Sequence, residues 1–77
     1  MSPRLPRPTG DELLRALRRA GWQVARVTGS HHHLVHPSQP GVLVTVAAHS
    51  GRSVPIGTLK EILDRAGIDA EELQRLL

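Results

Sequence analysis

The chain contains no cysteine, no phenylalanine and no tyrosine, and its single tryptophan is Trp22. Without cysteine there can be no disulfide bonds and no thiolate ligands for zinc, which is usual for proteins of a reducing cytosol. The chain also lacks an apolar run long enough for a signal peptide or a membrane span. We therefore expect a cytoplasmic protein that makes no membrane contact and has an aliphatic core around Trp22.

Acidic residues are scarce in the first 60 positions, which carry eight Lys or Arg against two acidic residues. The remaining 17 positions carry five acidic residues against two arginines. This asymmetry predicts a basic working face and an acidic C-terminal helix turned away from it. The cations from which contacts to an anionic partner would come are Arg15, Arg18, Arg19, Arg26, Arg52 and Lys60.

A chain of 77 residues forms one small domain with a modest core. Residues 1–8 combine three prolines with two arginines and show no apolar periodicity, which predicts a mobile arm. Residues 9–77 should form the domain. Thr9 with Glu12 three residues later is a capping-box pattern, and Gly21 is placed to end the helix that follows.

Three short strands should follow this first helix, over residues 22–27, then 31–35 or 30–36, and finally 42–48. The run Pro37–Gly41 should break the chain between the second and third strands. Apolar residues recur at helical spacing from Ile56 to Gly67, and a short last helix should follow Asp69. The fold class is therefore α+β, an α-β-β-β-α two-layer domain with a short extra C-terminal helix.

Four of the five histidines lie in the stretch GSHHHLVHP, residues 29–37. On a strand, His31 and His33 point to one face and His32 to the other, so the run offers too few convergent ligands for a tetrahedral metal site. We expect no metal and no cofactor. His32, His33 and His36 are expected to fill strand positions as scaffold, and Trp22, directly after a helix-ending glycine, to belong to the core.

His31 has neighbours that suit phosphodiester chemistry. Gly29 and Ser30 form a turn that can expose backbone N–H groups, and Arg26 lies upstream on the same hairpin. A histidine can exchange a proton near neutral pH, while a cation and amides can stabilise charge on phosphorane oxygens. This combination favours His31 as the catalytic residue. The assisting proton donor stays open: His33 on the same strand face is one candidate, and His32 or water are the alternatives.

The motifs TGDELLRALRRAGW, RVTGSHH, HP and VTVAAHSGRSVPIGTLKEILDRAGID occur here in the order and spacing of a known family. Across residues 9–77 the sequence resembles the HicA family of bacterial toxins, which are mRNA interferases paired with a HicB antitoxin. The resemblance implies a fold like a double-stranded-RNA-binding domain and cleavage of RNA without a required metal. It places the catalytic histidine of the Gly-Ser-His motif on His31. The apolar Val54-Pro55-Ile56 departs from the polar residues that many relatives carry there.

The resemblance therefore implies a toxin that cleaves mRNA, with RNA and a HicB-like antitoxin as partners. Separately, an exposed strand edge on so small a chain would allow a homodimer. We expect RNA contacts from Gly29, Ser30, Arg26, Arg19 and Lys60. Two alternatives stay open at this point. One is a module that binds double-stranded RNA without cleaving it, since the fold is shared by such domains. The other is a protein-interaction module that docks an acidic partner and has no affinity for RNA.

Overall fold

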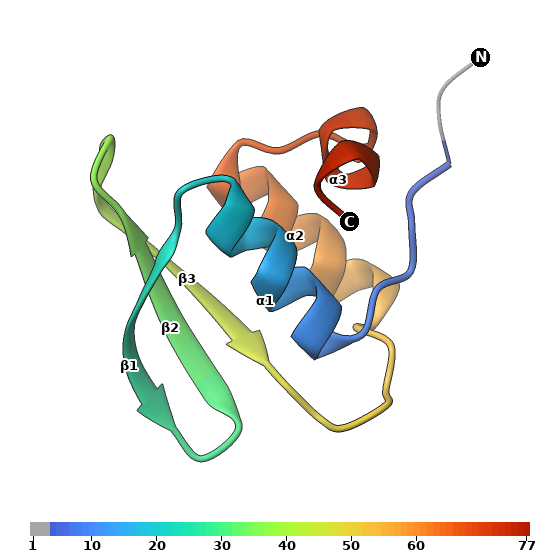
Figure 1. Cartoon of the computed structure of the whole chain (residues 1–77), viewed down its shortest axis with the longest axis horizontal. Coiled ribbons are helices and arrows are strands. Elements are labelled where there is room, and N and C mark those ends of the chain that lie inside the picture. The colour runs from blue at the N-terminus through green and yellow to red at the C-terminus, as the bar shows by residue number, and fades with distance from the viewer. Residues whose placement is uncertain (1–3) are drawn as a thin grey trace.

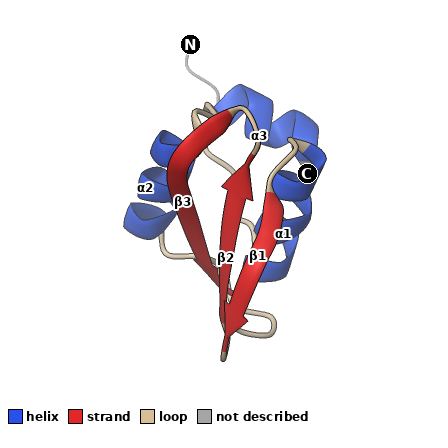
Figure 2. Cartoon of the chain, turned by 90° about the vertical axis from the view of Figure 1, so that its left-hand side faces the viewer, coloured by secondary structure: helices blue, strands red, loops and turns tan. Residues whose placement is uncertain are grey.

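The computed structural model describes residues 4–77, so the first three residues of the predicted arm lie outside the described part. The elements in chain order are α1 (Gly10–Arg19), β1 (Gln23–Thr28), β2 (His31–His36), β3 (Gln39–Ala47), α2 (Ile56–Ala66) and α3 (Ala70–Leu76). The helices lie together on one side of the sheet, and the view onto the other side shows the three strands in front of them (Figures 1 and 2). The predicted α+β two-layer arrangement is confirmed.

The predicted helix ends are also confirmed. The Thr9 N–H donates to Glu12 Oε1 at 2.8 Å, and the Glu12 N–H donates to Thr9 Oγ1 at 3.2 Å, which closes the capping box of α1. The hydrogen bond from the Thr9 backbone is the main reason why the pKa of the Glu12 carboxyl lies below its ordinary value. Glycines in the left-handed region, Gly21 and Gly67, follow the last turns of α1 and α2.

The sheet is antiparallel with the order β1-β2-β3, so β2 is central and β3 is an edge strand. β3 begins at Gln39, three residues earlier than the sequence predicts, and the break between β2 and β3 shrinks to the turn Pro37–Ser38. Pro40 is tolerated there because β3 lies at the sheet edge, where a missing N–H need not interrupt the ladder. Gly41, two residues after the partner of His36, has a φ of 83°, and the register between β2 and β3 shifts between Leu34 and His36.

The core lies between the sheet and the helices and is aliphatic except for Trp22, which is 2% exposed, as predicted. Residues 4–8 lie along this domain: the Val54 N–H donates to the Pro8 carbonyl at 2.8 Å, and Leu5 packs against the core. None of the helices in residues 4–77 is long and apolar enough to cross a membrane. The fully buried side chains that form the centre of the core are Leu13, Leu17, Leu34, Leu59, Leu73, Val44 and Val46.

Candidate nucleic-acid interface

The register of β2 divides the histidine run between the two faces of the sheet. Leu34 pairs with Val44 and His32 pairs with Val46, and residues directly opposite each other share a face. Because Leu34, Val44 and Val46 are fully buried, their face is the one that the helices cover, and His32 belongs to it. The other members of the run therefore point to the open face, in agreement with the alternation that the sequence predicts.

The open face carries His31 and His33 side by side along β2. His31 pairs with Thr28 and Ala47, and His33 pairs with Arg26 and Thr45. Two residues of strand separate the two histidines by about 6.5–7 Å. No helix covers this face, which is the one turned toward the viewer in Figure 2. The structure thus brings together two imidazoles and a guanidinium where an extended ligand can reach them.

The two ring environments on this face differ. His33 Nδ1 lies 3.0 Å from Thr45 Oγ1, and the side chain is half-buried. His31 is exposed, and its ring has no hydrogen-bond partner among residues 4–77. The contact to Thr45 was not anticipated from the sequence. The alternation of β3 could have indicated it, because Thr45 lies between the core residues Val44 and Val46 and so must face outward with His33.

The turn before His31 is tight and exposed. Gly29 has a φ of 60°, and with Ser30 it forms a two-residue link between the paired residues Thr28 and His31. Glycine is required at the first position of such a hairpin turn because the backbone there is left-handed. The Ser30 carbonyl accepts a hydrogen bond from the Ala48 N–H at 2.9 Å, which fixes the turn to the end of β3. The Gly29–Ser30 turn and His31 are therefore held in place at the end of the sheet by this hydrogen bond to Ala48.

Two of the predicted RNA-contacting cations lie elsewhere. Arg19 donates from Nη1 to the Leu76 carbonyl at 2.6 Å, so its guanidinium holds the end of α1 against the end of α3. Lys60 lies on α2 beside a hollow that Leu5 and Asp64 also line. Both positions belong to the helical layer, on the side of the sheet away from His31. Of the three cations predicted to contact RNA, Arg19, Arg26 and Lys60, Arg26 alone shares the open face with the two histidines.

His36 has a structural environment. Its Nε2 lies 3.0 Å from the Ala20 carbonyl, and its Nδ1 accepts from the Ser38 N–H at 3.0 Å. A carbonyl oxygen only accepts, so the ring proton must be on Nε2. The ring also packs edge-on against Trp22, with centroids 5.2 Å apart. Both ring nitrogens are therefore engaged, and His36 acts as the scaffold that the sequence predicts, joining the end of α1 to the β2–β3 turn.

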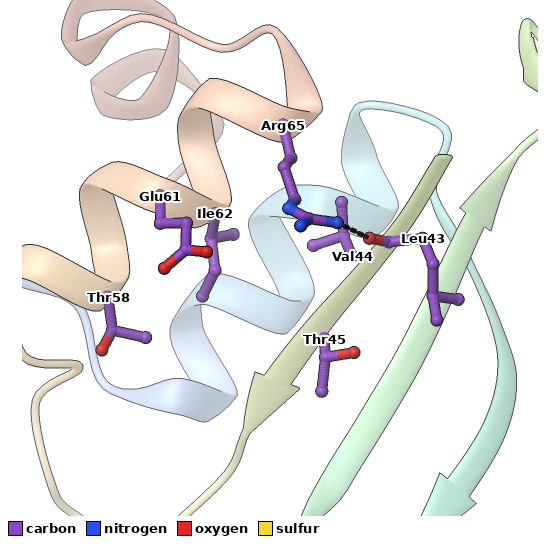
Figure 3. A pocket seen from close by; sticks show the side chains of 7 residues that line it. All are labelled: Leu43, Val44, Thr45, Thr58, Glu61, Ile62 and Arg65. Atoms are coloured by element: carbon purple, nitrogen blue, oxygen red, sulfur yellow. Dashed lines mark hydrogen bonds between the residues drawn. The ribbon is translucent and has the colours of Figure 1, made fainter. Parts of the chain in front are cut away.

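A groove of about 300 Å³ runs between α2 and the outer edge of β3. Figure 3 shows Arg65 reaching from α2 across this groove to β3, where Nη1 donates to the Leu43 carbonyl at 3.4 Å. Glu61 and Thr58 complete the α2 side of the groove. A cation at an unpaired strand edge hinders pairing with a second chain. The groove contains no histidine, so it offers no acid or base comparable to the open face.

Charge on the described surface is largely uncompensated. Within residues 4–77 the one ion pair closer than 4.0 Å joins Arg75 to Glu71 on α3. Arg26 therefore has no carboxylate partner within that distance in this part of the chain. No three His, Asp or Glu side chains of the described chain gather as metal ligands. The open face thus carries two histidines and the guanidinium of Arg26, which is unpaired within residues 4–77, and together they can meet an anion.

A comparison with protein-family models matches residues 10–68 to the HicA toxin of bacterial toxin–antitoxin systems. The chain belongs to the HicA toxin family. The match runs from the start of α1 through the sheet to the end of α2, and so includes the whole histidine run. A search of curated proteins found no match. As a toxin of a toxin–antitoxin system, the protein has an antitoxin as its partner.

Proposed function

We propose that this HicA-family toxin is an endoribonuclease that cleaves mRNA without a required metal ion, with His31 as its general base. One observation carries the proposal: the strand register places His31, His33 and Arg26 together on the uncovered face of the sheet. An exposed imidazole without a ring partner is free to accept a proton from a substrate. The membership of the HicA family supports the same reading, since the sequence resemblance implies RNA cleavage.

The chemistry follows from the two imidazoles. His31 takes the proton of the ribose 2′-OH, and the 2′ oxygen attacks the adjacent phosphorus. The bond from phosphorus to the 5′ oxygen breaks, and His33 gives that oxygen a proton. The products are a 2′,3′-cyclic phosphate and a 5′-hydroxyl, and the need for a 2′-OH makes RNA rather than DNA the substrate. Arg26 stabilises the charge that develops on the phosphorane oxygens.

Thr45 has a defined part in this scheme. As the general acid His33 is an imidazolium with a proton on each ring nitrogen, so its Nδ1–H donates to Thr45 Oγ1 and its Nε2–H is left to protonate the leaving oxygen. Thr45 is then a positioning residue for the general acid. A Thr45→Val variant should lower the cleavage rate and alter the basic limb of its pH profile, because the general acid must be protonated. A Thr45→Ser variant, which keeps the hydroxyl, should restore both.

The test uses purified protein and a long single-stranded RNA in the presence of EDTA. Cleavage by the wild type should survive EDTA, and His31→Ala should lower the rate by about 10²–10⁴-fold. His49→Ala is the matched control, because His49 is an exposed histidine of the loop after β3. RNA fragments that carry 3′-hydroxyl and 5′-phosphate ends would contradict the scheme. Binding of RNA without cleavage would instead identify a non-catalytic RNA-binding module.

The proposed antitoxin is a HicB-like protein that covers the open face. It would hide His31 and so block access of RNA to the site. Addition of a HicB-like protein encoded beside this toxin should therefore abolish cleavage. Retention of full activity in a saturated complex would show that the antitoxin acts at another surface.

A further inference from the structure

The helix-covered face of the sheet carries a second polar site, near the same hairpin end as His31. A hollow of about 310 Å³ lies between α1 and the first two strands, and it is lined by Asp11, Leu14, Arg15, Arg18, Val24 and His32. The α1 residues among them follow one another at helical spacing and so form a single stripe. His32 is the side chain that the sheet contributes from its central strand.

The ring of His32 has a defined proton arrangement. Its Nδ1 lies 3.2 Å from the Ser30 carbonyl oxygen, and because a carbonyl only accepts, the proton is on Nδ1. In the neutral ring, Nε2 then has a free lone pair, and it has no hydrogen-bond partner among residues 4–77. A backbone carbonyl that fixes Nδ1–H in this way is a common means of presenting Nε2 to a ligand.

The charges around the hollow favour an anion. Arg15 and Arg18 are exposed, and neither has a carboxylate within 4.0 Å in the described chain, where Arg75 and Glu71 form the ion pair. Asp11 is the one acidic residue of the lining, so the fixed charge of the hollow is positive. Guanidinium groups are well suited to phosphate because their planar N–H groups match two phosphate oxygens.

We propose that this hollow binds one ribonucleotide of a single-stranded RNA. Arg15 and Arg18 hold the phosphate, and the ribose 2′-OH donates a hydrogen bond to His32 Nε2. The choice of RNA as ligand rests on the proposed function, but the site lies on the opposite face of β2 from His31. The RNA strand then passes around the Gly29–Ser30 turn. The Ser30 carbonyl orients His32, and the next residue after the turn is His31. The hollow is a second contact that anchors the substrate beside the cleavage site.

The experiment measures the affinity of a fluorescent 12-nucleotide RNA and of the DNA of the same sequence, over a range of salt concentrations. All measurements use a His31→Ala background so that the RNA survives, and gels of the samples verify this. Arg15→Gln and Arg18→Gln should weaken the binding of both nucleic acids. Each should make the negative slope of log K against log salt shallower by about 0.7, the value for one phosphate contact on a single strand.

The remaining variants separate the ribose contact from the phosphate contact. His32→Ala should weaken RNA binding by about 2- to 12-fold, the worth of one hydrogen bond, and leave DNA binding unchanged. Asp11→Asn removes the opposing charge and should tighten both complexes. Arg75→Gln is the control, because that guanidinium is paired on α3, and it should change neither affinity nor slope.

Two results would overturn the inference. An unchanged salt slope in both Arg15→Gln and Arg18→Gln would show that neither arginine contacts a phosphate. An equal loss of RNA and DNA binding in His32→Ala would show that His32 makes no contact with the ribose 2′-OH. If either result is found while the wild type still cleaves RNA in a His31-dependent way, the RNA contact at the hollow is refuted and the proposed nuclease is retained. Loss of binding in the expected pattern without any cleavage by the wild type keeps the hollow and refutes the proposed nuclease. Loss of antitoxin binding alone in these variants would make the hollow a protein-docking site instead.

Discussion

Replacing Gly10 with alanine should destabilise the protein through steric contact with the backbone at the end of β3. Gly10 is the first residue of α1, and a Cβ built there would lie 2.5 Å from the Ala47 carbonyl oxygen and 2.8 Å from Ala48 Cα. An ordinary contact begins at 3.4 Å, so helix and strand must separate by about 0.9 Å. Both neighbours are backbone atoms, which cannot rotate away. Overpacking of this kind costs about 1–3 kcal/mol, and the better helix propensity of alanine offsets at most about 1 kcal/mol.

The assay is urea denaturation with a thermal melt of the same samples. We expect a loss of about 1–2 kcal/mol, and each kcal/mol lowers the Tm of a domain of this size by about 4–8 °C. Gly57→Ala is the matched control: Gly57 lies in the first turn of α2 with open space around it, and alanine there should stabilise by up to about 1 kcal/mol. Because Ala47 pairs with His31, Gly10→Ala should also slow the proposed RNA cleavage. A Gly10→Ala protein as stable as the wild type would refute this view of the α1–β3 contact.

Three further outcomes can be checked with the same denaturation assay. The pKa of Glu12 is lowered on folding from 4.5, mainly by the Thr9 backbone N–H, so its stabilising effect is present above pH 4.5 and is lost as the pH falls through the lower, folded value. Glu12→Gln should therefore flatten the dependence of unfolding free energy on pH in the acid range, and an unaltered slope would contradict this. His36→Ala should cost about 1–3 kcal/mol because it leaves the Ala20 carbonyl without its donor, whereas a loss below about 0.5 kcal/mol would show that water replaces the ring. Leu34→Ala should cost about 2–5 kcal/mol, since this side chain is fully buried between the sheet and the helices; a smaller loss would mean that the core closes over the cavity.

Local signals in the sequence predicted most of the fold. The Thr9–Glu12 capping box and the glycines after α1 and α2 act over three or four residues, so their consequences can be read without tertiary information. The start of β3 could not be read in this way. Pro40 and Gly41 predict a break in isolation, and only the edge position of β3 makes them acceptable within a strand.

The candidate site was predictable in part for the same reason. Alternation along β2 is a local property, and it correctly separated His32 from its two neighbours. The selection of cations was not local. Arg19 and Arg26 are equivalent by charge, but tertiary packing commits Arg19 to the carbonyl of Leu76 and leaves Arg26 opposite His33. The hollow beside His32 depends likewise on how α1 crosses the sheet, which no spacing in the sequence specifies.

The hydrogen bonds of the ring nitrogens rank the histidines of β2 for chemistry. His36 has both nitrogens bound to backbone groups, so it could exchange a proton only by giving up one of these bonds. His32 and His33 each have one nitrogen bound, to a carbonyl and to a hydroxyl, which orients the ring and leaves the other nitrogen for a ligand. His31 alone has both nitrogens free within the described chain, at the exposed corner where the strand begins. A base that accepts a proton and returns it must move between two charge states without disturbing the fold, and of these four rings His31 meets that condition best.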